Sequence, residues 1–341
     1  MKPFTTRPKA NKDAIVSGKN YRFTILTEGL FRYEWAEDGQ FEDRASTLAI
    51  NRDLPVPEFR VLDNGEDSLE IITSRFHLSY DKKRFSPSGL LVDVKRKMTP
   101  WGAQWRYGDF GGSLGGTART LDEADGRIPM GSGVASRLGY ACIDDSGSMM
   151  FDGDGWIGGR KSGDRNDGYL FCYGHDYKDA IKAYYKISGS QPLLPRWALG
   201  NWWSRYHPYS ADEYIALMDK FREERIPLSV GVVDMDWHWV HDKHVTHAGW
   251  TGYSFNRNLF PDPAAFRCEM RKRDLKITLN DHPHNGVHAF EDSYEEMAIA
   301  INHDTSHRNP ILFDPTNRKF FKAFFDVLHR NVEKEACDFW W

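Results

Sequence analysis

Short apolar runs separated by turn-forming residues fill roughly the first half of the chain. The runs are rich in aromatic and β-branched side chains, which favour strands. Seven of them predict strands, at residues 21–26, 30–35, 59–62, 69–73, 77–80, 139–144 and 148–151. The last two flank Asp-Ser-Gly and are expected to pair with each other as a hairpin. Short strands joined by tight turns predict an antiparallel β-sandwich over residues 1–187.

A helix and a stiff connector follow this β-rich half. Apolar side chains recur at helical spacing over residues 177–184, and Gly189 lies just past the expected end of the helix. Two prolines then stiffen residues 191–195. We therefore place a domain linker at residues 188–198.

Strands and helices alternate in the remainder of the chain. Apolar runs predict strands at residues 199–203, 228–233, 275–279 and 337–341. Helices are expected between them, at about 211–225, 262–273 and 317–335. Ser210, with Glu213 three residues later, forms a capping box at the start of the first of these helices.

Four such βα repeats indicate a parallel sheet. We predict that residues 199–341 form the first four βα units of a (β/α)8 TIM barrel. A doubly wound sheet is the alternative, but no glycine-rich phosphate loop follows the first strand. The fourth strand runs to Trp341 without a following turn, and four of eight barrel strands would leave an open edge. We therefore expect the sequence to be a fragment of a longer protein.

Polar and aromatic residues gather where each predicted barrel strand ends. Barrel enzymes carry their catalytic and binding groups at these C-terminal ends. The segments in question are residues 202–207, 234–237, 280–283 and 340–341. Carboxylates accept hydrogen bonds from neighbouring hydroxyls, and indole rings cover apolar C–H faces, so the mixture predicts a sugar-binding pocket.

Asp234 and Asp236 lie two positions apart after the second predicted strand. If the extended backbone continued, both carboxylates would point the same way, and one could bind a sugar hydroxyl. The alternative is a helix cap or a loop turn. The pair is not expected to be a glycosidase nucleophile and acid, because those carboxyls flank the scissile bond and usually come from different elements.

A regular run of histidines follows, at positions 238, 241, 244 and 247. On a helix each three-residue step turns the side chain by about 60°, so the four cannot share one face. A solvated or hydroxyl-binding loop is the prediction, and no metal site is expected. Asp152 and Asp154 resemble part of a calcium loop, but the later Glu is missing and a turn is expected.

Composition narrows the class of protein. The formal charge of -4 gives no general attraction to nucleic acid or acidic membranes. Aromatic residues make up 14% of the chain, which suits a carbohydrate site. Four well-separated cysteines suggest neither a disulfide framework nor zinc. With no visible signal peptide and no long apolar run, we expect a cytoplasmic protein without a membrane span.

Five stretches together carry a resemblance to a known family. They are residues 111–122 (Gly-Gly-Ser-Leu-Gly-Gly-Thr-Ala-Arg-Thr-Leu-Asp), 195–200, 204–206 with 234–236, 256–266, and 338–341. In this order they resemble glycoside hydrolase family 31. The first resembles a loop of the family's N-terminal domain that leans over the active site, and the last resembles the start of the fourth barrel strand.

The resemblance implies that one set of residues lines the subsite for the non-reducing sugar: Tyr206, Asp234, Met235, Leu279, Asp281 and Trp341. The family's nucleophile and acid/base would both lie beyond Trp341, so no catalytic residue is assigned within the chain. Residues 280–282 and the histidine run differ from the best-known α-glucosidases, which leaves the sugar and linkage open. Asp274 stands where a helix-ending glycine is common.

The function that the resemblance implies is retaining hydrolysis of α-linked oligosaccharides, as in an α-glucosidase, with no cofactor. The 341-residue chain by itself is expected to be inactive. Two alternatives stay open: an α-transglycosylase on the same scaffold and a noncatalytic carbohydrate-binding protein. In each case the expected partner is an oligosaccharide or α-glycoside, without nucleic acid or membrane.

Overall fold

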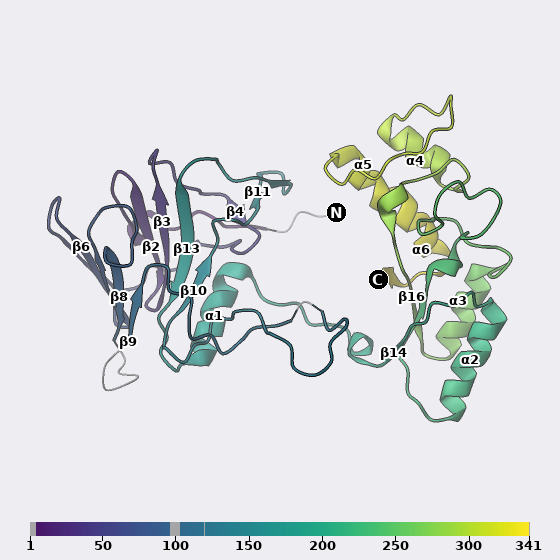
Figure 1. Ribbon diagram of the computed structural model, residues 1–341, viewed down its shortest axis with the longest axis horizontal. Coiled ribbons are helices and arrows are strands. Elements are labelled where there is room, and N and C mark those ends of the chain that lie inside the picture. Colours follow the sequence, from purple (N-terminus) through teal and green to yellow (C-terminus); the bar gives the residue numbers. More distant parts are fainter. Residues whose placement is uncertain (1–4, 96–102, 119, 341) are drawn as a thin grey trace. The chain divides into compact units, whose positions relative to one another are not determined.

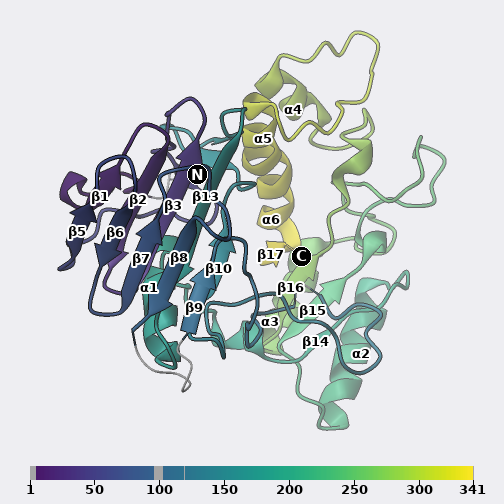
Figure 2. The same ribbon diagram turned by 60° about the vertical axis from the view of Figure 1, so that its left-hand side comes forward.

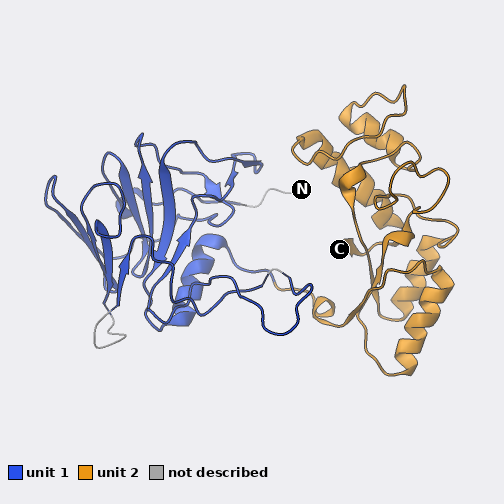
Figure 3. Cartoon of the chain, in the orientation of Figure 1, with its two compact units in different colours: residues 1–192 blue, residues 193–341 orange. Residues whose placement is uncertain are grey.

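The computed structural model describes residues 5–95, 103–118 and 120–340. The chain divides into two compact units, Met1–Pro192 and Leu193–Trp341 (Figure 3). The regular structure of the first is mainly antiparallel strands, and that of the second is parallel strands and helices.

Three antiparallel sheets make up the first unit. The first sheet contains, in spatial order, β1 (Ile15–Ser17), β2 (Tyr21–Thr27), β3 (Leu30–Ala36), β13 (Arg165–Phe171) and β10 (Ala141–Asp144). The second contains β5 (Arg60–Asp63), β6 (Leu69–Ile72), β7 (Phe76–Tyr80), β8 (Leu90–Val94) and β9 (Ala103–Arg106). A small third sheet contains β12 (Ile157–Gly158), β11 (Met150–Phe151) and β4 (Ala45–Ser46).

The two five-stranded sheets share one aromatic core, and Figures 1 and 2 show them as separate layers. The Phe23 and Tyr80 rings meet edge to face across it, with centroids 5.3 Å apart. Burial alternates along β7, as a strand with one covered face requires. By contrast, every residue of β2 is buried. Its second face is covered by helix α1 (Tyr177–Ser188), which shares an apolar cluster with Leu26, and by residues 42–43, which Arg22 contacts.

The hairpin expected from residues 139–144 and 148–151 is wrong. β10 pairs with β13, whereas β11 pairs with β4 and β12. β13 is seven residues long and mostly buried, and it lies between β10 and β3. Gly168 in β13 lets the Tyr33 ring lie against the backbone, since an added Cβ would stand 2.3 Å from the Tyr33 hydroxyl. Turn-forming residues between neighbouring strands cannot predict a pairing with a strand so far away in the sequence.

A four-stranded parallel sheet forms the centre of the second unit. Its strands, in order, are β14 (Trp202–Trp203), β15 (Val230–Val233), β16 (Lys276–Leu279) and β17 (Phe339–Trp340). All four predicted strands are present, but the first is shorter than expected. Residues Arg196–Leu199 instead form a 3-10 turn after Pro195.

The helices of the second unit follow the strands in the expected alternation. They are α2 (Ala211–Glu223), α3 (Pro263–Lys272), α4 (Tyr294–Ile301), α5 (Arg318–Ala323), the π-helical segment η5 (Phe324–His329) and α6 (Arg330–Ala336). The capping box of Ser210 and Glu213 is confirmed at the start of α2. Helix α4 was not predicted, although it buries Tyr294 and Met297 in a cluster with α5 and η5.

Helices α2 and α3 contribute, with the sheet, to one apolar core. Gly231 in β15 permits this packing, because an added Cβ would stand 2.7 Å from the Met270 methyl group of α3. Asp274, just beyond α3, has φ +58°, the left-handed conformation that a helix-ending glycine usually adopts. The resulting layout brings the C-terminal ends of β14–β17 to one edge of the sheet.

Candidate functional site

The C-terminal edge of the parallel sheet gathers polar side chains from neighbouring strands. Val233 is paired with Leu279, and Leu279 with Trp340. Asp234 and Asn280, the residues that follow β15 and β16, are therefore side by side. The Asn280 amide nitrogen donates a hydrogen bond to Asp234 Oδ1. A carboxylate is thus held at the strand end by an amide from the next strand.

Asp234 also caps the short 3-10 turn η3 (Met235–Trp237), where its Oδ1 accepts a 2.7 Å bond from the Met235 backbone N–H. The extended backbone that would aim Asp234 and Asp236 the same way is not observed, because the chain turns directly after β15. The capping geometry that the sequence left open is the one observed. Asp236 is only 8% exposed. Burial raises the pKa of its carboxyl, while nearby His241 acts in the opposite direction.

A second carboxylate belongs to a three-residue stack at the same edge. Asp281 Oδ2 lies 2.7 Å from His329 Nε2. The His329 ring stacks on Trp340, with centroids 4.1 Å apart and planes 20° from parallel. The Tyr253 hydroxyl donates to the other Asp281 oxygen at 3.3 Å. Asp281, His329 and Trp340 therefore form a wall that is planar and apolar on the rings and charged at the carboxylate.

The π-helical segment η5 explains how His329 reaches this wall. The single helix expected at about 317–335 is instead α5, η5 and α6 in succession. A π-helical turn contains more residues than an α-helical turn and so changes the direction in which later side chains point. His329 is the last residue of η5 and is buried. Sequence reasoning did not identify it, because no helical periodicity marks such a turn.

Trp237 contacts the same edge from the interior of the second unit. Its side chain is completely buried, and its indole N–H donates to the Asn280 carbonyl at 3.1 Å. The Trp237 and Trp340 rings are 6.1 Å apart at a steep angle. This bond holds the backbone of Asn280, whose side chain in turn holds Asp234.

A buried acid lies behind Tyr253. Glu291 is 5% exposed and accepts bonds from the Ser254 hydroxyl at 2.6 Å and the Tyr253 backbone N–H at 3.1 Å. Burial raises the pKa of Glu291 to about 7, although both of these bonds act in the opposite direction. Because Tyr253 also contacts Asp281, Glu291 supports the Asp281 side of the edge indirectly.

The predicted sugar-binding residues lie in different environments. Met235 and Leu279 are 5% and 1% exposed, and Leu279 belongs to the core of the second unit. Tyr206 follows β14 in a loop and is 62% exposed. Asp234 and Asp281 lie at the edge described above, whereas Trp341 is outside the described residues. Among the described residues, no hydrogen bond or ring contact joins Tyr206 to either carboxylate.

The histidine run lies in the loop after η3. His238 is buried and its Nδ1 lies 3.1 Å from the Trp239 carbonyl oxygen, and burial lowers its pKa to about 4. His244 Nδ1 lies 2.5 Å from an Asp242 oxygen, and His247 packs against His288 with ring centroids 4.3 Å apart. No cluster of three or more metal-ligating side chains occurs in residues 5–95, 103–118 and 120–340.

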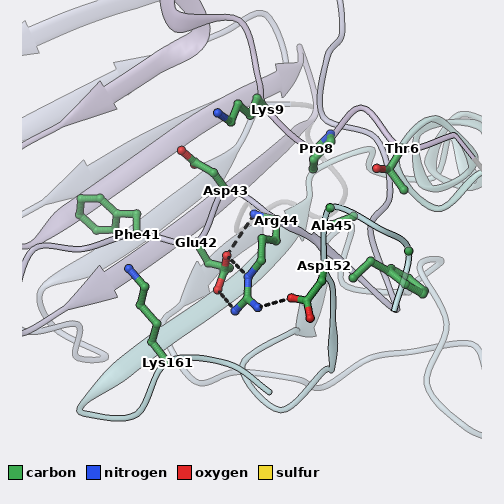
Figure 4. A pocket seen from close by; sticks show the side chains of 13 residues that line it. Thr6, Pro8, Lys9, Phe41, Glu42, Asp43, Arg44, Ala45, Asp152 and Lys161 are labelled. Atoms are coloured by element: carbon green, nitrogen blue, oxygen red, sulfur yellow. Dashed lines mark hydrogen bonds and ion pairs between the residues drawn. The ribbon is translucent and has the colours of Figure 1, made fainter. Parts of the chain in front are cut away.

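A cavity of about 470 Å³ is lined by residues of the first unit (Figure 4). None of the predicted site residues lines it. In the part of the chain that the structure describes, no helix is long and apolar enough to cross a bilayer.

The second unit matches a known family of domains. Residues 191–341 match the model of the glycosyl hydrolases family 31 TIM-barrel domain. An alpha-xylosidase of Saccharolobus solfataricus is 33% identical over 165 residues, which are 47% of this chain and 21% of that protein. Alpha-glucosidase 2 of Bacillus thermoamyloliquefaciens is 30% identical over 111 residues, 33% of this chain and 13% of that protein. The matched segments thus span a small part of these relatives.

Solved structures share the fold over almost the whole chain. A family 31 dextranase of Flavobacterium johnsoniae superposes with a TM-score of 0.62 at 15% identity, covering 95% of this chain and 45% of that one. A family 31 alpha-xylosidase from a soil metagenome gives a TM-score of 0.58 at 15% identity, covering 96% and 57%. The fold is therefore an N-terminal β domain followed by part of a TIM barrel.

Proposed function

The chain belongs to glycoside hydrolase family 31, and from that premise we propose that the complete enzyme hydrolyses α-glycosidic bonds with retention of configuration. The observation that carries this proposal is the row of polar groups at the C-terminal edge of the parallel sheet. Asp234 is held by Asn280, and Asp281 is held by His329. Such strand ends are where barrel enzymes bind their substrates.

In the proposed complex, one pyranose ring lies against this edge. Asp234 accepts hydrogen bonds from the sugar hydroxyls, since a carboxylate can accept more bonds than the two it receives from Met235 and Asn280. Trp340 offers an indole ring for the C–H face of the sugar, and the stacked His329 supports that ring. The roles of Tyr206 and Trp341 in the same subsite stay predictions.

The chemistry of retention needs two carboxyl groups. One attacks the anomeric carbon and displaces the leaving oxygen, which the second protonates; water activated by the second group then releases the sugar from the glycosyl-enzyme. The proposal assigns neither group to residues 1–341. The chain covers 45% of the dextranase and 57% of the alpha-xylosidase structure. We therefore expect no turnover by the 341-residue chain, and a reaction only in a longer polypeptide.

The substrate is proposed to be an α-linked xyloside or glucoside. The relatives with the matched segments are named alpha-xylosidase and alpha-glucosidase 2. Transglycosylation by the same glycosyl-enzyme is the second possibility. Product analysis at high substrate concentration would separate the two, because a transglycosylase yields longer oligosaccharides instead of free sugar. A cytoplasmic location stays a prediction.

The decisive experiment compares Asp234→Asn with Asp262→Asn in the complete enzyme. Asp262 is also an aspartate N-cap of the second unit, with a 2.9 Å bond from the Ala265 N–H, but it lies at the start of α3. Asparagine keeps the cap at both positions. We expect Asp234→Asn to reduce kcat/KM for 4-nitrophenyl α-xyloside and α-glucoside by about 100-fold or more, equivalent to the roughly 3 kcal/mol of a charged hydrogen bond.

The Asp262→Asn control should retain full activity. Proton NMR of the first product should show the α-anomer. Equal activity of the two variants, or a β-anomer as first product, would refute the proposed function.

A further inference from the structure

A cavity of about 470 Å³ in the first unit is lined by residues that the proposed active site does not use. It lies where the segment that leads from β3 to β4 meets the loop between β11 and β12. Its volume is within the roughly 300–1,000 Å³ range typical of small-molecule sites. The side chains that line it include two aromatic rings, Phe41 and Phe151, and charged groups of both signs, namely Lys9, Glu42, Asp43, Arg44, Asp152 and Lys161.

Arg44 is held by several hydrogen bonds to other residues of the cavity lining (Figure 4). Its guanidinium binds both oxygens of Glu42, at 2.9 and 2.7 Å, and Asp152 at 3.0 Å. It also donates to the Gly159 carbonyl at 3.0 Å. Burial acts to raise the pKa of Glu42, but the Arg44 bonds and charge lower it to about 2. The pair therefore stays ionised at neutral pH and ties the β3–β4 segment to the β11–β12 loop.

Two buried arginines hold the same segment from the sheet behind it. Arg22 and Arg32 donate to the Glu42 backbone carbonyl at 3.1 and 2.9 Å. Arg22 also binds Asp43 Oδ1 at 2.7 Å and lies 5.0 Å from the centroid of the Phe41 ring. Arg22 is itself paired with Glu34, and Arg32 is paired with Asp167. A wall fixed in this way is preorganised, which reduces the entropic cost of binding a ligand.

The charges that line the cavity cancel. Lys9, Arg44 and Lys161 supply three positive groups, and Glu42, Asp43 and Asp152 supply three negative ones. Asp43 and Asp152 each bind an arginine through one carboxylate oxygen, which leaves the other able to accept from a hydroxyl. Lys161 donates one hydrogen bond to Gln40 at 2.8 Å, and its ammonium group can donate two more.

Because these charges cancel, the cavity offers no net electrostatic attraction to a phosphate or carboxylate ligand or to a cation. A neutral polyol needs no such attraction, because each hydroxyl can donate to a carboxylate and accept from an ammonium group. The Phe41 ring adds an apolar surface suited to a C–H face. We propose that this cavity is a second, noncatalytic binding site for a neutral oligosaccharide, separate from the strand-end site of the second unit.

The test is calorimetric titration of the 341-residue chain with maltotriose, which needs no turnover. Phe41→Ala and Asp43→Asn should each weaken the binding by about tenfold, the factor expected for loss of one ring contact or one good hydrogen bond. The matched controls are Phe110→Ala and Asp164→Asn. Phe110 is an exposed phenylalanine of the same unit, and Asp164 is an exposed aspartate that also pairs with an arginine, Arg84 at 2.8 Å. Neither control residue lines the cavity.

Circular dichroism and thermal unfolding will show whether each variant is folded, and Lys161→Gln provides a third variant on the exposed rim of the cavity. Titration with glucose 6-phosphate tests the neutrality argument, since its phosphate should bind no more tightly than maltotriose. The proposal would be overturned by an absence of saturable maltotriose binding at millimolar concentration, or by binding that none of the three cavity variants weakens.

Asp234→Asn separates this site from the proposed active site. Binding that is lost in Asp234→Asn but kept in Phe41→Ala would place the sugar at the strand ends and overturn the second site alone. Binding that survives Asp234→Asn and is weakened by Phe41→Ala supports the second site, whatever the outcome of the hydrolysis experiments.

Discussion

Glu291 is the group whose ionisation should affect the second unit most visibly near neutral pH. Its carboxyl is buried and bound to Ser254 and to the backbone of Tyr253. Burial raises its pKa from 4.5 to about 7. Between these values the folded state holds a proton that the unfolded state has released. The free energy of unfolding therefore falls as the pH rises through this interval, and the contribution is complete only below pH 4.5.

The difference between the two pKa values of Glu291 determines how much the free energy of unfolding changes. Each unit of pKa difference corresponds to about 1.4 kcal/mol, so a rise from 4.5 to about 7 corresponds to about 3 kcal/mol between the acidic and alkaline ends. Histidines also change how the free energy of unfolding depends on pH. Burial lowers the pKa of His238 to about 4, so its contribution is lost as the pH falls. The two effects overlap, and only a variant that removes the carboxyl separates them.

Glu291→Gln keeps an oxygen for Ser254 and Tyr253 but cannot ionise. We expect its free energy of unfolding to rise relative to wild type by up to about 3 kcal/mol between pH 5 and pH 8. Glu295→Gln, at an exposed position of α4, is the control and should track wild type at every pH. Urea unfolding followed by circular dichroism measures the difference, and hydrogen exchange of peptides from residues 251–301 assigns it to the second unit. A constant difference between Glu291→Gln and wild type across this range would refute the reasoning.

Three further predictions follow from single contacts. Asp281→Asn should lose the charged bond to His329 and lower the free energy of unfolding by about 1–3 kcal/mol, while also weakening sugar binding by the complete enzyme; urea unfolding and titration check the two effects. Ser210→Ala removes the capping box of α2 and should cost about 1 kcal/mol in thermal unfolding, whereas an unchanged Tm would contradict the cap's role. Asp274→Gly relieves a left-handed conformation and should change stability by at most about 1 kcal/mol in the favourable direction, because glycine also loosens the unfolded chain. A marked loss of stability would mean that interactions of the Asp274 side chain stabilise the fold by more than its left-handed backbone conformation destabilises it.

Local signals in the sequence were sufficient for most individual elements. The apolar runs that predict β2 and β3 became seven-residue strands, and periodicity with caps located α2 and α3 to within a few residues. The polar segments after the barrel strands also came to one edge of the sheet, since parallel strands share their C-terminal direction. These features depend on side chains close together in sequence, or on a rule that holds for every parallel sheet.

Contacts between distant residues were decided only by the tertiary structure. β10 pairs with β13 instead of its neighbour in sequence, and Asp234 turns into a cap instead of continuing the strand. His329 reaches Asp281, 48 residues away, because a π-helical segment redirects it. Such contacts depend on which residues pack around a group in the folded chain, and the spacing of residues along the sequence does not reveal them. The sequence by itself therefore determined many of the individual elements and which end of the parallel sheet is polar, although not α4, the π-helical segment or β13. Packing decided which side chains meet at that end.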